Sequence, residues 1–162
     1  MSGRVLPLLL AGLLCLPLTS CFSYHSQYRK SVAAADGKFE DPTGPWKGRW
    51  LSKHNGHEGP LWCMVSETPD RPGFYDFRYR AGWGVFQFGD YTHTVEAEKT
   101  PEGHLLVKGD MELPKFVGTY SLDGKVTSKD FKAAYTSTTG DHGDMTLARP
   151  EPKKQPAAAP AE

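Results

Sequence analysis

The chain lacks an excess of charge of either sign. Its 162 residues include 19 Lys and Arg and 19 Asp and Glu, so the formal net charge is zero. A basic face is what attracts nucleic acid or an anionic bilayer, and the composition supplies none. The sequence therefore predicts no nucleic-acid partner.

Long apolar runs are also missing, apart from "VLPLLLAGLLCLPL" over residues 5–18. A transmembrane helix needs about 20 apolar residues, so this run is too short to span a bilayer comfortably. It contains Pro7 and Pro17, which disfavour a lasting membrane helix, and Arg4 precedes it. We therefore predict that residues 1–20 are a secretory signal peptide.

The end of that run carries a motif. Leu18-Thr19-Ser20-Cys21 resembles the lipobox of bacterial lipoproteins. The resemblance implies cleavage before Cys21, a diacylglyceryl group on its thiol and a further acyl chain, such as palmitate, on its new amino group. Because each buried methylene contributes roughly 0.8 kcal/mol, two or three chains make a lasting anchor. Phe22, rather than Asp, follows the cysteine, which favours the outer membrane. The alternative is an ordinary secreted protein in which this cysteine is a coincidence.

Cysteine is scarce. Cys15 leaves with the signal peptide and Cys21 carries lipid, so Cys63 has no disulfide partner in the mature chain. It lies in the apolar stretch "PLWCMV", which predicts a buried, inert thiol. A reactive thiol would need a cationic neighbour.

Three segments follow the signal peptide. Residues 21–44 lack a sustained apolar period and are predicted to be the lipidated cysteine and a flexible tether. Residues 45–149 form one domain. Residues 150–162 are rich in Pro, Ala and Lys and are predicted to be disordered.

The domain lacks any convincing helical period, and its apolar residues alternate instead. "FYDFRYRA", for example, places Tyr75, Phe77 and Tyr79 on one face and Asp76 and Arg78 on the other. We expect eight strands near 46–53, 60–67, 74–81, 85–98, 104–112, 116–122, 125–136 and 143–149. The expected inward aromatic residues are Tyr75, Phe77, Tyr79, Phe86, Phe88, Phe116, Tyr120, Phe131 and Tyr135.

The turns between these strands are short, which favours an antiparallel meander. Asp123-Gly124 predicts a tight hairpin, and the apolar phase slips by one residue at Gly89-Asp90, which predicts a β-bulge. Eight meander strands can close and remove both edges. The predicted fold is all-β, an eight-stranded up-and-down barrel, with an open sheet or a two-layer sandwich as the alternative. The short domain favours a mostly filled barrel with a shallow mouth.

One short motif suggests a family. Gly48-Arg49-Trp50 resembles the G-x-W that opens the first strand of lipocalins, and more loosely of avidins. The resemblance implies a calycin-like barrel in which Arg149, late in the domain, packs over Trp50. From the residues alone, Trp50 is a core aromatic whose indole N–H needs a partner.

Catalytic motifs are absent: there is no G-x-S-x-G, H-E-x-x-H, phosphate-binding glycine loop or Cys-x-x-Cys. Two loops, with His54, His57 and Glu58 in one and Asp141, His142 and Asp144 in the other, could bind a metal if they met at one end of the barrel. These are also ordinary turn residues. We predict no enzyme, no cofactor and no metal.

Two function classes remain. The first is a membrane-anchored barrel that binds a small apolar ligand or a lipid. The second is a module that contacts or inhibits an envelope protein through an exposed surface. Trp50 and Arg149 are candidate contacts, as are Arg78, Arg80 and Trp83, because Trp and Arg dominate interface hot spots. The alternative for the last three is a solvated strand face. A hollow barrel would favour the first class, and a filled barrel with an exposed aromatic patch the second.

Overall fold

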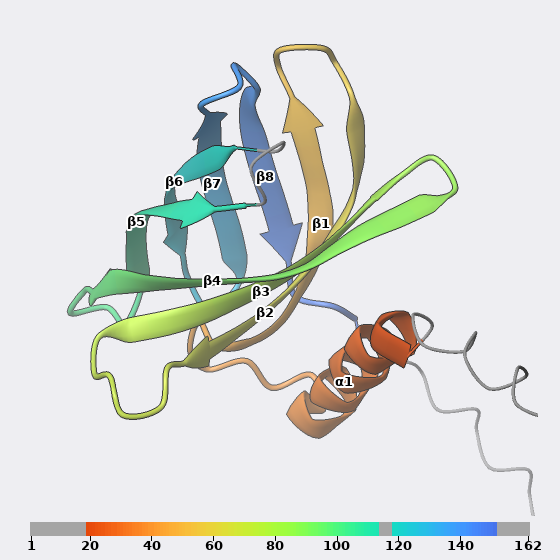
Figure 1. The fold of residues 1–162 in the computed structure, drawn as a ribbon. Helices are drawn as coiled ribbons and strands as arrows, with labels where there is room; N and C mark the ends of the chain where they lie inside the picture. The colour runs from red at the N-terminus through yellow and green to blue at the C-terminus, as the bar shows by residue number, and fades with distance from the viewer. Residues whose placement is uncertain (1–18, 114–117, 152–162) are drawn as a thin grey trace, which may run out of the picture.

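A computed structural model describes residues 19–113 and 118–151, without the side chains of residues 19–23. Helix α1 (Thr19–Ala35) precedes eight strands: β1 (Gly44–Ser52), β2 (Glu58–Glu67), β3 (Phe74–Trp83), β4 (Phe86–Lys99), β5 (Leu105–Glu112), β6 (Thr119–Val126), β7 (Asp130–Ser137) and β8 (His142–Ala148). Each strand pairs antiparallel with the next, and β8 pairs with β1, which closes the barrel (Figure 1). The predicted eight-stranded meander barrel is confirmed, and the open sheet and the sandwich are excluded.

The predicted bulge in β4 is confirmed. Tyr79 of β3 pairs with Tyr91, whereas Ala81 pairs with Phe88, so two residues of β4 face one residue of β3. Gly89 has φ 74°, a conformation that other residues adopt only with strain. Beyond this bulge the β3–β4 hairpin bends away and projects past the rest of the barrel (Figure 1).

The hairpin predicted at Asp123-Gly124 is wrong. Both residues lie inside β6, where Gly124 pairs with Val107 on one side and Ala133 on the other. A Cβ on Gly124 would lie 2.5 Å from the Cβ of Ala133, so this glycine serves close packing rather than a turn. The chain turns later, where Thr127 N donates to Asp130 O at 2.8 Å.

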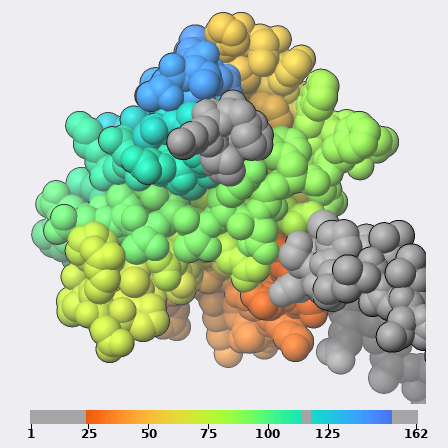
Figure 2. Space-filling model, viewed as in Figure 1, coloured from red at the N-terminus to blue at the C-terminus, as the bar shows by residue number. Residues whose placement is uncertain are grey.

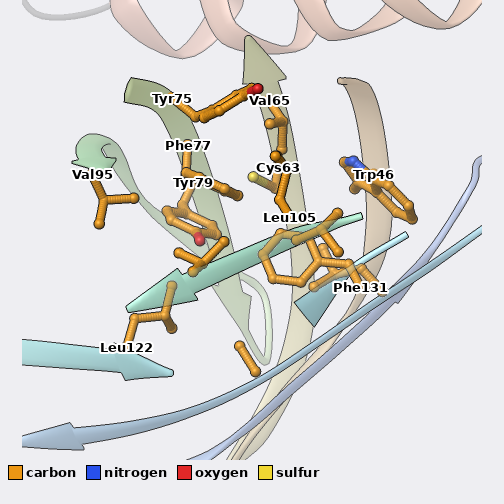
Figure 3. Close-up of a cluster of buried hydrophobic side chains, with 14 of the residues drawn as sticks. Trp46, Cys63, Val65, Tyr75, Phe77, Tyr79, Val95, Leu105, Leu122 and Phe131 are labelled. Carbon is orange, nitrogen blue, oxygen red and sulfur yellow. The ribbon is translucent and has the colours of Figure 1, made fainter. Parts of the chain in front are cut away.

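The two ends of the barrel differ. At the closed end β1 begins and β8 ends, and the β6–β7 turn crosses beside them. Ring contacts fill this end: Phe131 lies 5.9 Å from Trp46 and 5.8 Å from Phe77 between centroids. Figure 3 shows these side chains converging on one another with Cys63, which is fully buried as predicted. The open end carries the β1–β2, β3–β4 and β7–β8 loops.

The tryptophan that anchors the closed end and packs under Arg149 is Trp46, so the pairing of Arg149 with Trp50 that the lipocalin resemblance implies is wrong. Trp46 is fully buried, whereas Trp50, on the same face of β1, is half-buried nearer the open end. The Arg149 guanidinium stacks on Trp46, with Cζ 3.6 Å from a ring centroid. The strand register explains why Arg149 stacks on Trp46 and not on Trp50. Ala148 pairs with Lys47, so the next residue, Arg149, lies opposite Trp46.

Arg149 also joins the segment before β1 to the β6–β7 turn. Its Nε donates to Ser128 O at 2.8 Å, and its Nη1 donates to Thr43 O at 2.8 Å. A further bond runs from Nη2 to the carbonyl of Asp41. Burial lowers the Arg149 pKa to about 10, partly offset by Asp41. Arg149 is thus a structural clamp at the closed end, and its role as a ligand or partner contact stays a prediction.

Two of the predicted inward aromatics are exposed. Phe86 and Phe88 belong to the part of β4 that projects beyond the barrel, so no opposite wall covers them. Tyr120 is half-buried. The other five are buried: Tyr75, Phe77, Tyr79, Phe131 and Tyr135. Phe116 lies outside the described residues.

Helix α1 stands where the sequence predicts a flexible tether. Tyr24 and Tyr28, four residues apart on one helix face, are both buried. The Tyr24 hydroxyl donates to Arg78 O at 3.2 Å, which fixes the helix to the barrel wall. The helix ends before Asp36 and Gly37, which have positive φ values. Two tyrosines among polar residues give too weak a periodic signal to reveal this helix from sequence.

Candidate functional site

The open end of the barrel is lined by inward-facing side chains that are only half-buried. On β1 the inward row passes from buried Trp46 to half-buried Trp50, and on β8 it passes from buried Leu147 to half-buried Met145. The gradient is not general, because Ser52 on β1 and Tyr135 on β7 lie toward the same end and are buried. We define the mouth by six half-buried, inward-facing residues: Trp50, Ala81, Tyr91, Met111, Tyr120 and Met145. These six residues are thus less buried than the inward-facing residues of the closed end, and the predicted shallow opening stays a prediction.

The register brings the mouth residues together. Met111 pairs with Tyr120, and Trp50 pairs with Met145. The indole N–H of Trp50 donates to Gly82 O at 3.1 Å, so its ring is held in place across the barrel wall. That bond satisfies the only polar atom of the indole side chain, and the Phe88 ring packs edge-on against the indole at 6.4 Å.

A carboxylate lies beside the mouth. Asp141, from the β7–β8 loop, accepts hydrogen bonds from the Ser52 hydroxyl and from the Tyr120 hydroxyl, the latter at 3.3 Å. Burial and, as the next largest cause, the charge of Asp141 raise the pKa of nearby Tyr135 to about 12. The Tyr120 and Tyr135 rings contact each other at a tilt, with centroids 5.7 Å apart, so this wall of the open end is aromatic with a hydrogen-bonded acid at its rim.

Tyr79 supplies a polar group below the mouth. It pairs with Tyr91 across β3 and β4, and its hydroxyl is buried without a hydrogen-bond partner among the described residues. Burial raises its pKa well above the ordinary tyrosine value, so the group is a neutral O–H donor. Buried hydroxyls are usually paired, which makes this donor a feature that a bound polar atom would satisfy.

The three residues predicted to form an exposed contact differ in how much of their side chains is exposed. Trp83 is exposed as predicted, and its ring lies 4.8 Å from that of His57. Arg78 is half-buried beneath α1, where its Nη2 donates to Asp90 at 2.6 Å. Arg80 is 4% exposed, so its predicted exposure is wrong; its Nη1 donates to Gly89 O at the bulge.

The two histidine-containing loops do meet at the open end. The rings of His54 and His142 lie 6.2 Å apart, and Lys53 binds Asp144 at 2.6 Å. Within residues 19–113 and 118–151, no group of three His, Cys, Asp or Glu side chains could hold a metal ion. The contact between the loops is an aromatic and ionic one.

The predicted lipidation site lies at the edge of what the structure describes. Cys21 belongs to the first turn of α1, but its side chain and residues 1–18 lie outside the described part. Of the described helices, none has the length and hydropathy needed to cross a membrane. The anchor therefore stays a prediction from Leu18-Thr19-Ser20-Cys21.

Comparison of the chain with protein-family models, with curated proteins and with solved structures finds no match. What the fold establishes is therefore the architecture: an eight-stranded antiparallel up-and-down barrel, consistent with a calycin-like barrel. The sequence analysis found most of the aromatic lining but missed Met111, Met145 and Asp141 as neighbours of the mouth. Alternation places Met111 and Met145 on inward faces, whereas only the β7–β8 contact brings Asp141 to the rim.

Proposed function

We propose that the protein is a lipoprotein of the bacterial cell envelope, anchored through Cys21, that binds a small apolar ligand or a lipid at the mouth. The observation that carries this proposal is that six inward-facing side chains near the open end, the mouth residues, are half-buried, whereas the inward-facing side chains of the closed end are buried. Inward apolar surface that water can reach is a cost to a fold and a benefit to an apolar ligand.

The chemistry of the mouth supports an elongated apolar ligand with one polar end. Trp50 and Tyr91 offer flat ring surface, and Met145 offers an adaptable side chain. The hydroxyl of Tyr79 is a buried donor below them. A ligand with an acceptor at one end could satisfy this donor and cover the rings with its hydrocarbon part.

The outer membrane is the location that fits the absence of Asp after Cys21. A protein held at a bilayer meets apolar molecules at high local concentration, so a shallow site can be occupied without high affinity. The role we propose is binding without catalysis.

Photo-crosslinking tests this proposal. A fatty acid with a diazirine in its acyl chain is added to native membranes that contain the full chain, and the adducts are mapped by mass spectrometry after irradiation. We expect adducts on peptides that carry Trp50, Tyr120 or Met145.

Two matched variants make the result specific. Met145→Asp places a charge in the mouth and should lower the adduct yield at least about fivefold, whereas Leu106→Asp places one on an exposed apolar position of β5 and should not. Adducts that are confined to Cys21 and to exposed loops, or that Met145→Asp leaves unchanged, would contradict a ligand site at the mouth.

A further inference from the structure

The tip of the β3–β4 hairpin is the most exposed apolar surface among the described residues that stand together in sequence. Val85 is 92% exposed and Phe86 is 69% exposed, and Trp83 and Phe88 flank them. The seven residues from 83 to 89, "WGVFQFG", carry no charge. Figure 2 shows this hairpin projecting at the upper right of the surface. Adjacent exposed apolar side chains of this kind indicate a contact site rather than scattered surface residues.

The local backbone holds the tip in this exposed position. Trp83 pairs with Phe86, which leaves Gly84 and Val85 as a two-residue loop. Gly84 has φ 57°, and an added Cβ would meet nothing within 4 Å, so the turn rather than a lack of space requires glycine. Val85 is therefore the outermost residue of a rigid two-stranded arm.

The hairpin contacts the helix that carries the predicted anchor. His25 Nε2 lies 2.7 Å from Gln87 Oε1, and the His25 ring packs edge-on against Trp62 at 5.2 Å. Cys21 precedes His25 by four residues of the same helix, which is about 6 Å along the axis. Tyr24 is fully buried between them, so this end of the helix is fixed to the barrel. In Figure 1 the start of α1 and the hairpin tip lie on the same side of the molecule.

We propose that the hairpin tip, Trp83, Val85, Phe86 and Phe88, inserts into the interface of the bilayer that holds the lipid on Cys21. The proposal rests on the anchoring proposed above, because that anchor is what makes a lipid surface the neighbour of the tip. Tryptophan and phenylalanine favour the headgroup region, and the tip has no charge to desolvate. Anchor and tip together would give the barrel two contacts with the membrane and thus a defined orientation.

This geometry also connects the membrane to the mouth. Phe88 packs edge-on against Trp50 at 6.4 Å, and Trp50 is part of the mouth. A molecule that leaves the bilayer along the hairpin would therefore meet apolar side chains without a gap between membrane and site.

The test places a fluorophore at the tip. Val85→Cys in the full chain is labelled with a polarity-sensitive nitrobenzoxadiazole group, and Glu102→Cys, in the β4–β5 turn at the other end of the barrel, is the matched control. Cys63 stays unlabelled because it is fully buried, and burial raises the pKa of its thiol. A Cys21 thiol without lipid would also take the fluorophore, so any such sample is measured again with Cys21→Ser. Each protein is mixed with vesicles of phosphatidylethanolamine and phosphatidylglycerol in a 7:3 ratio.

We expect a blue shift of about 10 nm or more at position 85, and quenching there when the lipids carry a quencher in their acyl chains, with neither effect at position 102. Equal emission at the two positions would overturn the tip proposal. So would a shift at position 85 that appears only with native membrane proteins and not with pure lipid, since that result indicates a protein partner.

The mass of the N-terminal peptide is measured on the same samples. An acylated Cys21 with an unshifted position 85 means that the anchor is right and the tip proposal wrong. An unmodified Cys21 with a shifted position 85 means that the tip binds lipid and the anchor is wrong. The two proposals can therefore fail separately.

Discussion

The closed end and the open end of the barrel contain the same kinds of aromatic residue, but these residues differ in burial and in packing. Trp46 and Trp50 lie on one face of one strand, four residues apart, yet the first is fully buried under Arg149 and the second is half-exposed at the mouth. Phe77 and Phe131 pack ring against ring at the closed end, while Phe88 stands on a projecting hairpin. The comparison indicates that the closed end supplies more of the packing that stabilises the fold, and the open end is where we propose that a ligand binds.

Truncation of the two tryptophans should separate the ends most clearly. Trp46→Ala removes a fully buried ring and should lower the free energy of unfolding by about 3–5 kcal/mol. Trp50→Ala removes a half-buried ring and one hydrogen bond and should cost only about 1–2 kcal/mol. Urea unfolding followed by circular dichroism measures both, and equal losses would contradict the division between the ends.

The clamp at the closed end should show coupling. Arg149→Ala should cost about 2–3 kcal/mol, because the guanidinium binds several main-chain carbonyls and stacks on Trp46. Combined with Trp46→Leu, the loss should be smaller than the sum of the single losses. Arg49→Ala, which removes an exposed arginine of the same strand, should add to Trp46→Leu without coupling. Additive losses for Arg149 and Trp46 would mean that the stack contributes nothing.

The smallest expected effect is a pH dependence of stability that arises where β4 and β5 meet. These strands pair only from Ala97–Val107 to Lys99–Leu105, and beyond that the buried His93 ring contacts Asp110 O at 3.1 Å. Burial lowers the pKa of His93 from its ordinary value of 6.5, partly offset by Asp110. The unfolded chain therefore binds this proton more tightly than the folded one.

The contribution of neutral His93 to the free energy of unfolding should therefore be fully present above pH 6.5. It should be lost as the pH drops through the lowered pKa of the folded state. His93→Gln should flatten this decline while keeping a polar group near Asp110. Urea midpoints at a series of pH values provide the measurement, and an unchanged pH dependence in the variant would show that other groups cause it.

The period-two pattern predicted the barrel because inward and outward residues alternate in every strand. It could not locate positions where the barrel ends, so Phe86 and Phe88 were placed inside although the hairpin carries them beyond the wall. It could not choose between Trp46 and Trp50 either, since both have the same phase and only the register with β8 brings Arg149 opposite the first. Asp123-Gly124 shows a third limit: a glycine required for packing against Ala133 looks the same as one required for a turn.

Native mass spectrometry of the full chain, purified from its own membrane in a mild detergent, tests the central claim most directly. The account predicts a retained small apolar molecule that is released on collisional activation. It should be present in Leu106→Asp and absent or strongly reduced in Met145→Asp, because only the second change lies in the mouth. A chain that carries no molecule beyond its own lipid anchor under the gentlest conditions, or equal retention by both variants, would contradict a ligand site at the open end.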